Sequence, residues 1–212
     1  MILIIDLVWA LSLVLITSIM IFSDQFVFLT SNYPVFMGFM KFFVLATMGE
    51  LFGRRLTEGK WQIKGINLHK RAFVWGLFGI LFTYVFPIFS YGVDGLIKSE
   101  RLPVIFGLTL SKAFYKSFFM NILFAFPMMS LHRFTDTLID QNRFFSKWKI
   151  YQTMCMIDWE NMLKKVAPSI IWFWIPAHTI TFCLAEEYRI FVAALLGIAL
   201  GLILSIMKNK ES

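Results

Sequence analysis

Residues 72–89 read AFVWGLFGILFTYVFPIF, a stretch of eighteen residues that contains no charged side chain. A run of about 18 or more mostly apolar residues is long enough to cross the hydrocarbon core of a bilayer as a helix. Residues 190–207 form a second uncharged run, and residues 2–22 contain one charge, Asp6. Water cannot solvate that much apolar surface, so the sequence predicts an integral membrane protein.

The composition agrees with a membrane protein and leaves little room for a soluble domain. Of the 212 residues, 58% are hydrophobic and 16% are charged. A typical soluble domain is about 45–50% apolar and about 25% charged. We therefore expect the whole chain, residues 1–212, to form a single membrane-embedded domain.

The apolar segments predict an all-α, polytopic transmembrane helical bundle. The fifth segment is short, so a four-span arrangement stays open beside the six-span one. Residues 144–165 carry apolar side chains at helical spacing among lysines, which predicts an amphipathic helix on the membrane surface or docked against the bundle. The six apolar segments are residues 2–22, 34–52, 72–97, 104–131, 169–184 and 190–207.

Basic residues gather in the connections between the predicted spans. With six spans, fourteen lysines and arginines from residues 53–71, 132–168 and 208–212 fall on one side, against three on the other. Cytoplasmic loops collect Lys and Arg, so both termini are expected in the cytoplasm, and anionic lipid head groups are expected partners of these loops. The apolar start, without a presequence, favours a prokaryotic plasma membrane.

Several function classes lack the residues that they need. Cys155 and Cys183 lie far apart, as do His69, His132 and His178, so we expect no metal or redox site. No nucleophile, zinc or phosphate-loop motif occurs, and the net charge of +7 is spread over loops rather than a basic domain. We therefore expect no catalytic residue, no cofactor and no nucleic-acid partner.

A few polar residues interrupt the apolar segments. A charge at the centre of a bilayer costs roughly 2.5–3.5 kcal/mol on insertion scales, so each should face the bundle interior, water or an interface. Local pairs are expected for Glu50 with Arg54 and for Asp94 with Lys98, because each pair is spaced i,i+4. The seven residues are Lys41, Glu50, Asp94, Lys112, Lys116, Asn121 and His178.

Lys112 and Lys116 allow two interpretations. They lie one turn apart on one helical face, and together with Lys41 they could give a water-filled pathway a positive lining that favours anions. Alternatively, the fourth span begins near Ala113 and both lysines extend to the head groups. Both interpretations stay open at this point.

The stretch from residue 172 to 205 reads WFWIPAHTITFCLAEEYRIFVAALLGIALGLILS. It resembles the signature of the Mpv/PMP family of small peroxisomal and mitochondrial inner-membrane proteins. His178 and Thr181 stand where that signature has Gln and Asn, and Leu200 replaces its last Trp. Residues 204–205 match, and the other matching positions are Gly49, Glu50, Trp159, Trp174, Pro176, Phe182, Tyr188 and Arg189.

The resemblance covers residues 34–205 and implies a small helical membrane protein with channel-like properties. It divides the chain into an extra N-terminal span and loop at 1–33, a family-like bundle at 34–207 and a short basic tail at 208–212. It also draws attention to His178 and Thr181, which share a helix with the signature Phe182.

Together these observations predict a channel or carrier for small solutes, with a preference for anions. A non-transporting membrane scaffold that binds lipid or a protein partner is the alternative. The chain could line a pore by itself or as a homo-oligomer. The expected lining or solute-binding residues are Lys41, Lys112, Lys116, Asn121, His178 and Thr181.

Overall fold

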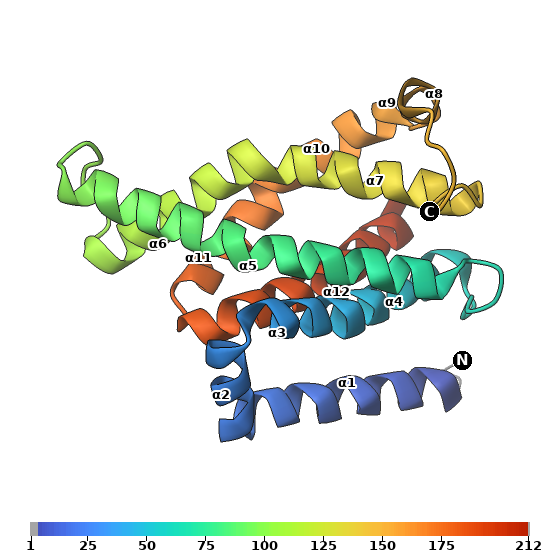
Figure 1. The fold of residues 1–212 in the computed structure, drawn as a ribbon, viewed down its shortest axis with the longest axis horizontal. Coiled ribbons are helices and arrows are strands. Elements are labelled where there is room, and N and C mark those ends of the chain that lie inside the picture. The colour runs from blue at the N-terminus through green and yellow to red at the C-terminus, as the bar shows by residue number, and fades with distance from the viewer. Residues whose placement is uncertain (1–3, 212) are drawn as a thin grey trace.

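A computed structural model describes residues 4–211, with the backbone alone for residue 165 and residues 203–211. Over that range the chain is helical and contains no strand, which confirms the predicted all-α class (Figure 1). The signature match at 204–205 and the tail at 208–212 lie outside the described side chains.

Four helices of the described part are long and apolar enough to cross a membrane, by length and composition. They correspond to the first four predicted segments and extend each of the last three at the C-terminal side. The four are α1 (Ile4–Phe22); Pro34–Glu58, made of α3 (Pro34–Lys41), η1 (Phe42–Ala46) and α4 (Thr47–Glu58); α5 (Leu68–Lys98); and Leu108–Asp140, made of α6 (Leu108–Met120), η2 (Asn121–Ala125) and α7 (Phe126–Asp140).

The fifth and sixth segments are also helical. The sixth is α12 (Glu186–Glu211), and the fifth begins ten residues before the predicted start. That all six segments cross a membrane stays a prediction. The fifth is a continuous succession of α9 (Trp159–Asn161), η3 (Met162–Val166), α10 (Ala167–Ser169), η4 (Ile170–Trp174) and α11 (Ile175–Phe182).

Two connecting regions differ from the sequence prediction. The predicted loop after the first segment contains a helix, α2 (Asp24–Asn32). The predicted amphipathic helix over 144–165 is wrong in extent, because only α8 (Ile150–Cys155) is helical before the chain turns. The Asp158 carboxylate then caps α9 by accepting a bond of 2.9 Å from the backbone N–H of Asn161, so a new helix begins there.

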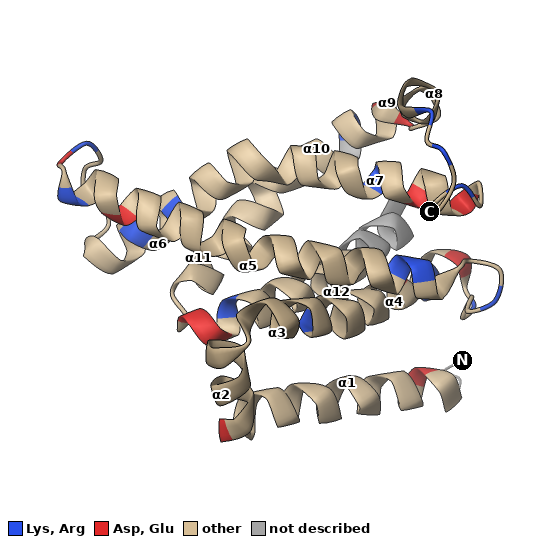
Figure 2. Ribbon diagram, in the orientation of Figure 1, with Lys and Arg blue, Asp and Glu red and all other residues tan. Residues whose placement is uncertain are grey.

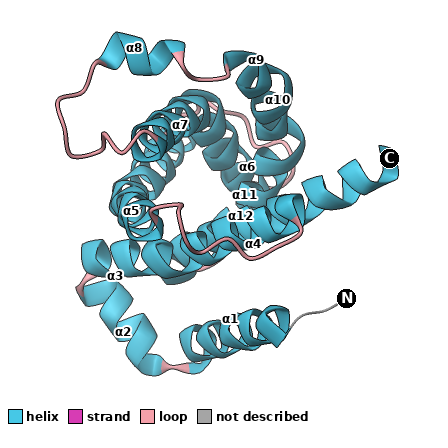
Figure 3. Ribbon diagram, turned by 90° about the vertical axis from the view of Figure 1, so that its right-hand side faces the viewer, coloured by secondary structure: helices cyan, strands magenta, loops and turns pink. Residues whose placement is uncertain are grey.

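Helix α1 stands apart from the other long helices (Figures 1 and 3). None of its residues is buried, although Leu13, Ile16 and Met20 pack against the core cluster. The Trp9 ring stacks on Phe52 with centroids 4.5 Å apart, its indole N–H donates to the Met48 carbonyl at 3.2 Å, and Arg55 pairs with Asp6 at 2.8 Å. That residues 1–33 are an addition to a separate bundle stays a prediction, and Phe26 of this stretch lies in the core of the bundle.

The remaining long helices surround a common centre, as the end view shows (Figure 3). Helices α3 and α5 approach most closely at Gly38 and Gly79. A Cβ atom on Gly79 would lie 2.0 Å from the Gly38 carbonyl oxygen, and one on Gly38 would lie 2.7 Å from that of Gly79. Since real Cβ atoms do not approach so closely, only glycine permits this helix contact.

Four π-helical segments interrupt the α-helices, and proline accounts for three of them. Pro127, Pro168 and Pro176 each lie two residues after a π-helical segment, η2, η3 and η4 respectively. A proline ring clashes with the carbonyl four residues earlier and offers no N–H to it. In all three cases that carbonyl belongs to the π-helical segment, whose wider turn moves it away from the ring.

Candidate functional site

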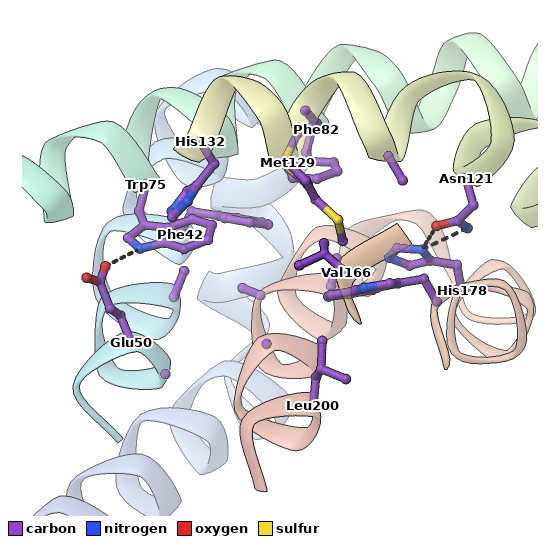
Figure 4. Close-up of a pocket in the computed structure, with 18 of the residues that line it drawn as sticks. Phe42, Glu50, Trp75, Phe82, Asn121, Met129, His132, Val166, His178 and Leu200 are labelled. Atoms are coloured by element: carbon purple, nitrogen blue, oxygen red, sulfur yellow. Dashed lines mark hydrogen bonds between the residues drawn. The ribbon is translucent and has the colours of Figure 1, made fainter. Parts of the chain in front are cut away.

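A cavity of about 310 Å³ lies at the centre of the helices (Figure 4). Its wall is built from η1 and α4, α5, α6 and η2, α7, η3, η4, α11 and α12. The volume is at the lower end of the range of about 300–1,000 Å³ that small-molecule sites occupy. The cavity is therefore large enough for one small ligand.

Each of the four π-helical segments contributes side chains to this wall. Phe42 comes from η1, Asn121 from η2, Met162 from η3 and Trp174 from η4. A π-helical turn is wider than an α-helical one, and such turns occur frequently at functional sites. Their convergence on one cavity, from four places in the sequence, marks this cavity as the candidate site.

One end of the cavity is defined by Asn121 and His178, two of the residues singled out in the sequence. His178 Nδ1 lies 3.1 Å from Asn121 Nδ2 and 3.2 Å from Asn121 Oδ1 (Figure 4). The Asn121 amide also donates to the Ser117 carbonyl at 2.8 Å, and the Ser117 hydroxyl donates to the Ile175 carbonyl at 2.6 Å. This network fixes α6, η2 and α11 relative to one another.

Trp174 completes that end. Its ring stacks on His178, with centroids 5.4 Å apart and an interplanar angle of 26°. Its indole N–H is buried, yet no acceptor lies within hydrogen-bond distance among the described residues. The contact between His178 and Asn121 uses Nδ1 in either tautomer, and no described residue forms a hydrogen bond with His178 Nε2. Two polar atoms are therefore left for a ligand.

The other end is defined by Glu50, Trp75 and His132 (Figure 4). Glu50 accepts a bond of 2.9 Å from the Trp75 indole N–H, and the rings of Trp75 and His132 lie 4.2 Å apart. His132 Nδ1 lies 3.3 Å from the Asp136 carboxylate. The sequence indicated no role for His132, because its position in the wall depends on how α7 packs against α5.

Behind this end lies a buried ionic cluster around Arg71, whose side chain is 2% exposed. The guanidinium pairs with Glu50 at 3.1 Å and Asp136 at 2.7 Å, and also bonds to Asp140. Arg54 adds the predicted i,i+4 pair with Glu50 at 3.3 Å. This Arg71 cluster joins α4, α5 and α7 at the edge of the cavity.

The three lysines expected to line a pathway lie elsewhere. Lys41 is completely buried, donates to the Glu187 carbonyl at 3.1 Å and lies 4.6 Å above the Phe26 ring. Lys112 and Lys116 pair with Asp94 at 3.1 Å and 2.8 Å. Asp94 thus takes its partners from α6 rather than from Lys98, and none of the three lysines is part of the cavity wall.

Thr181 is also outside the wall. It is buried, and its hydroxyl donates to the Ala177 carbonyl at 2.9 Å within its own helix. Of the six residues expected to line a pathway or bind solute, the structure brings Asn121 and His178 together at the cavity. Their contact spans 57 residues of sequence, so no local pattern indicated it.

The family-signature positions divide between the cavity and its surroundings. Gly49, Glu50 and Trp174 line the cavity. Pro176 lies two residues after Trp174, which is the last residue of η4. The others make contacts outside the cavity wall. Arg189 lies 5.6 Å from the Phe182 ring, the Tyr188 ring lies 6.1 Å from that of Phe26, and the Trp159 indole N–H donates to the Met154 carbonyl at 2.8 Å.

No family model matches this chain, and neither a curated protein nor a solved structure matches it. The resemblance to the Mpv/PMP family, and all that it implies, therefore stays a prediction. Among the described residues, no three His, Cys, Asp or Glu side chains are grouped as a metal site. What the site offers to a ligand is apolar contact, ring faces and two unused polar atoms.

Proposed function

We propose that the protein is an integral membrane channel or carrier for small solutes, and that the central cavity is its solute site. The observation that carries this proposal is the convergence of four π-helical segments on one cavity among four helices long enough to cross a membrane. Helix interruptions of this kind let side chains from several helices reach one point near the middle of a bundle.

The distribution of charge supports an orientation in the membrane. The start of α1, the 59–67 connection and the 141–149 connection lie at one end of the molecule, and the 99–107 connection lies at the other (Figures 1 and 2). The first end carries most of the basic connections. We propose that it faces the cytoplasm, in line with the bias of Lys and Arg in short loops. The prokaryotic plasma membrane stays a prediction.

The anion preference has less support than the cavity itself. It rested on Lys41, Lys112 and Lys116, whose ammonium groups are held by Glu187 or Asp94 away from the cavity wall. The charged wall residues Glu50 and Arg133 bring one negative and one positive group. We therefore propose transport of small solutes without a requirement for negative charge.

A liposome swelling assay tests this function. Purified protein in liposomes should admit glycerol faster than empty liposomes do, and the rate should fall to the background in Gly197→Leu. Gly197 lines the cavity, and a Cβ atom there meets nothing within 4 Å, so a leucine enters free space. Lactate serves as the anionic probe and should enter no faster than glycerol.

Gly92→Leu is the matched control. Gly92 also has open space at its Cβ position, but it lies on α5 outside the cavity wall. This variant should keep the wild-type rate. Two outcomes would contradict the proposal. One is that liposomes containing folded, inserted protein swell no faster than empty liposomes, and the other is that Gly197→Leu leaves the swelling rate unchanged.

A membrane scaffold is the second candidate, and one surface favours it. The basic-aromatic segment, residues 143–156, exposes Phe145, Trp148, Ile150 and Tyr151 beside basic residues. Exposed aromatic rings with adjacent lysines suit the interface of an anionic membrane. The same segment could equally position a transporter, so it does not exclude the first candidate.

Native mass spectrometry can test the scaffold candidate. The purified protein should retain phosphatidylglycerol in preference to phosphatidylcholine, and Lys147→Gln with Lys149→Gln should reduce that preference. Lys60→Gln with Lys64→Gln, in another basic connection, is the control. Strong lipid preference together with an absence of solute flux would favour the scaffold.

A further inference from the structure

We propose that the ligand of the cavity is a neutral, largely apolar molecule with a hydroxyl group, which lies between Trp174 Nε1 and His178 Nε2. This inference rests on the assignment of the cavity as the solute site. It adds a chemical class of ligand and an orientation within the cavity.

The wall selects for an apolar body. Methionine side chains line much of it, and they are flexible and polarisable enough to fit ligands of irregular shape. Phenylalanine rings close the space between them. The residues concerned are Met120, Met128, Met129, Met162, Phe82 and Phe124.

Trp174 calls for a hydrogen-bond acceptor. Its buried indole N–H has no acceptor in the described part of the chain. A buried polar group left without a partner is destabilising, and native structures usually provide a partner. Because Trp174 lines the cavity, an oxygen atom of a ligand can supply the missing acceptor.

His178 extends this requirement to a group that can both donate and accept. A neutral imidazole has one nitrogen that donates and one that accepts. Nδ1 can donate to Asn121 Oδ1, at 3.2 Å, or accept from Asn121 Nδ2, at 3.1 Å, so Nε2 accepts in the first tautomer and donates in the second. A hydroxyl group serves both tautomers while it accepts from the Trp174 indole, whereas a carboxylate can only accept.

The charges of the wall favour a neutral ligand. Glu50 lies at the end away from Asn121 and His178, and Arg133 directly follows His132 at that same end (Figure 4). Glu50 is already engaged by Trp75, Arg54 and Arg71. A charged group beside Trp174 would be desolvated without a counter-ion, which costs several kcal/mol.

Photo-crosslinking in nanodiscs tests this inference with a diazirine derivative of 1-decanol as the probe. The adduct should map to cavity residues such as Met129. Unlabelled 1-decanol should compete more strongly than decane or decanoate, because the alcohol satisfies both polar atoms without bringing a charge into the cavity. In Trp174→Phe, competition by 1-decanol should weaken about fivefold, the factor expected for one net hydrogen bond. Competition by decane should not change.

Trp172→Phe is the control, because Trp172 is exposed and lies outside the cavity wall. Adducts outside the cavity, stronger competition by decanoate, or unchanged competition by 1-decanol in Trp174→Phe would each overturn the inference. If one of these results were found while Gly197→Leu still abolished glycerol flux, the inference about the ligand would fail and the proposed transport function would stand. Specific alcohol binding without any flux would instead reject transport and keep the ligand class.

Discussion

The two ends of helix α5 carry ionic clusters built from similar residues in different surroundings. Arg71, near its start, is 2% exposed and bonds to carboxylates on α4 and α7. Asp94, near its end, is 36% exposed and bonds to Lys112 and Lys116 on α6. The Arg71 cluster joins three helices and borders the cavity through Glu50, while the Asp94 cluster joins two helices outside it.

This difference shows that burial, rather than the number of ion pairs, decides what a charged cluster does. A partly exposed pair contributes about 0–1 kcal/mol, because solvent already stabilises both charges. Removing one partner of a buried pair costs about 3–5 kcal/mol, because the remaining charge is left desolvated. The Arg71 cluster should therefore hold α4, α5 and α7 in place, and the Asp94 cluster should not.

The largest effect is expected for Arg71→Met. This change removes the shared partner of Glu50 and Asp136, so it should lower the free energy of unfolding by about 3–5 kcal/mol. Reversible unfolding in mixed micelles measures it. Adding Glu50→Gln should recover part of the loss, and a loss no larger than that of Asp94→Asn would contradict the comparison.

A smaller effect is expected for Asp136→Asn. Arg71 keeps Glu50 and Asp140, but it loses its bond of 2.7 Å, and His132 loses its carboxylate partner. The expected loss in the free energy of unfolding is about 1–3 kcal/mol. Asp140→Asn is the control, because Asp140 is 63% exposed, and its loss should be smaller under the same conditions.

Asp94→Asn should have a still smaller effect. Asp94 and Lys112 are about one-third exposed, so solvent screens their pair, while Lys116 is 9% exposed, and the expected loss is about 1 kcal/mol. Glycerol flux in the swelling assay should stay at the wild-type rate, because the cluster lies outside the cavity wall. A strong reduction of flux would place Asp94 on the pathway after all.

A change in salt concentration should have the smallest effect on the free energy of unfolding. It should also distinguish the Arg71 cluster from the Asp94 cluster most clearly. The Debye length falls from about 10 Å at 0.1 M salt to about 3 Å at 1 M. The stability difference between wild type and Asp94→Asn should therefore shrink towards zero at 1 M NaCl. The difference for Arg71→Met should persist, since the Arg71 side chain is only 2% exposed, and an equal decline in both differences would contradict this.

Sequence reasoning located the helices but not the partners of their polar residues. The run at 72–89 predicted the centre of α5, because apolar length alone identifies such a helix. Asp94, however, was expected to pair with Lys98 on its own helix, and its partners come from α6. Spacing along one helix indicates local neighbours only, whereas the packing of helices determines the others.

The candidate site was foreseen in part. Asn121 and His178 were identified because polar residues in apolar runs are costly, but their contact across 57 residues could not be read from the sequence. Proline disturbs the hydrogen-bond pattern of a helix, and π-helical segments precede Pro127, Pro168 and Pro176. The segment η1 has no such proline, so nothing in the sequence indicated it.

The π-helical segments also determine how this chain responds to changes in its length. Each amounts to one extra residue within a helix, and one residue corresponds to a rotation of about 100°. The wider turn of η2 absorbs that rotation, so α7 would keep its face towards Trp75 and Arg71 if Ile122 were deleted from η2. The deletion would instead remove the wider turn and bring the Pro127 ring against the Leu123 carbonyl. The cost of such a deletion would therefore fall on the backbone beside the proline rather than on the packing of α7.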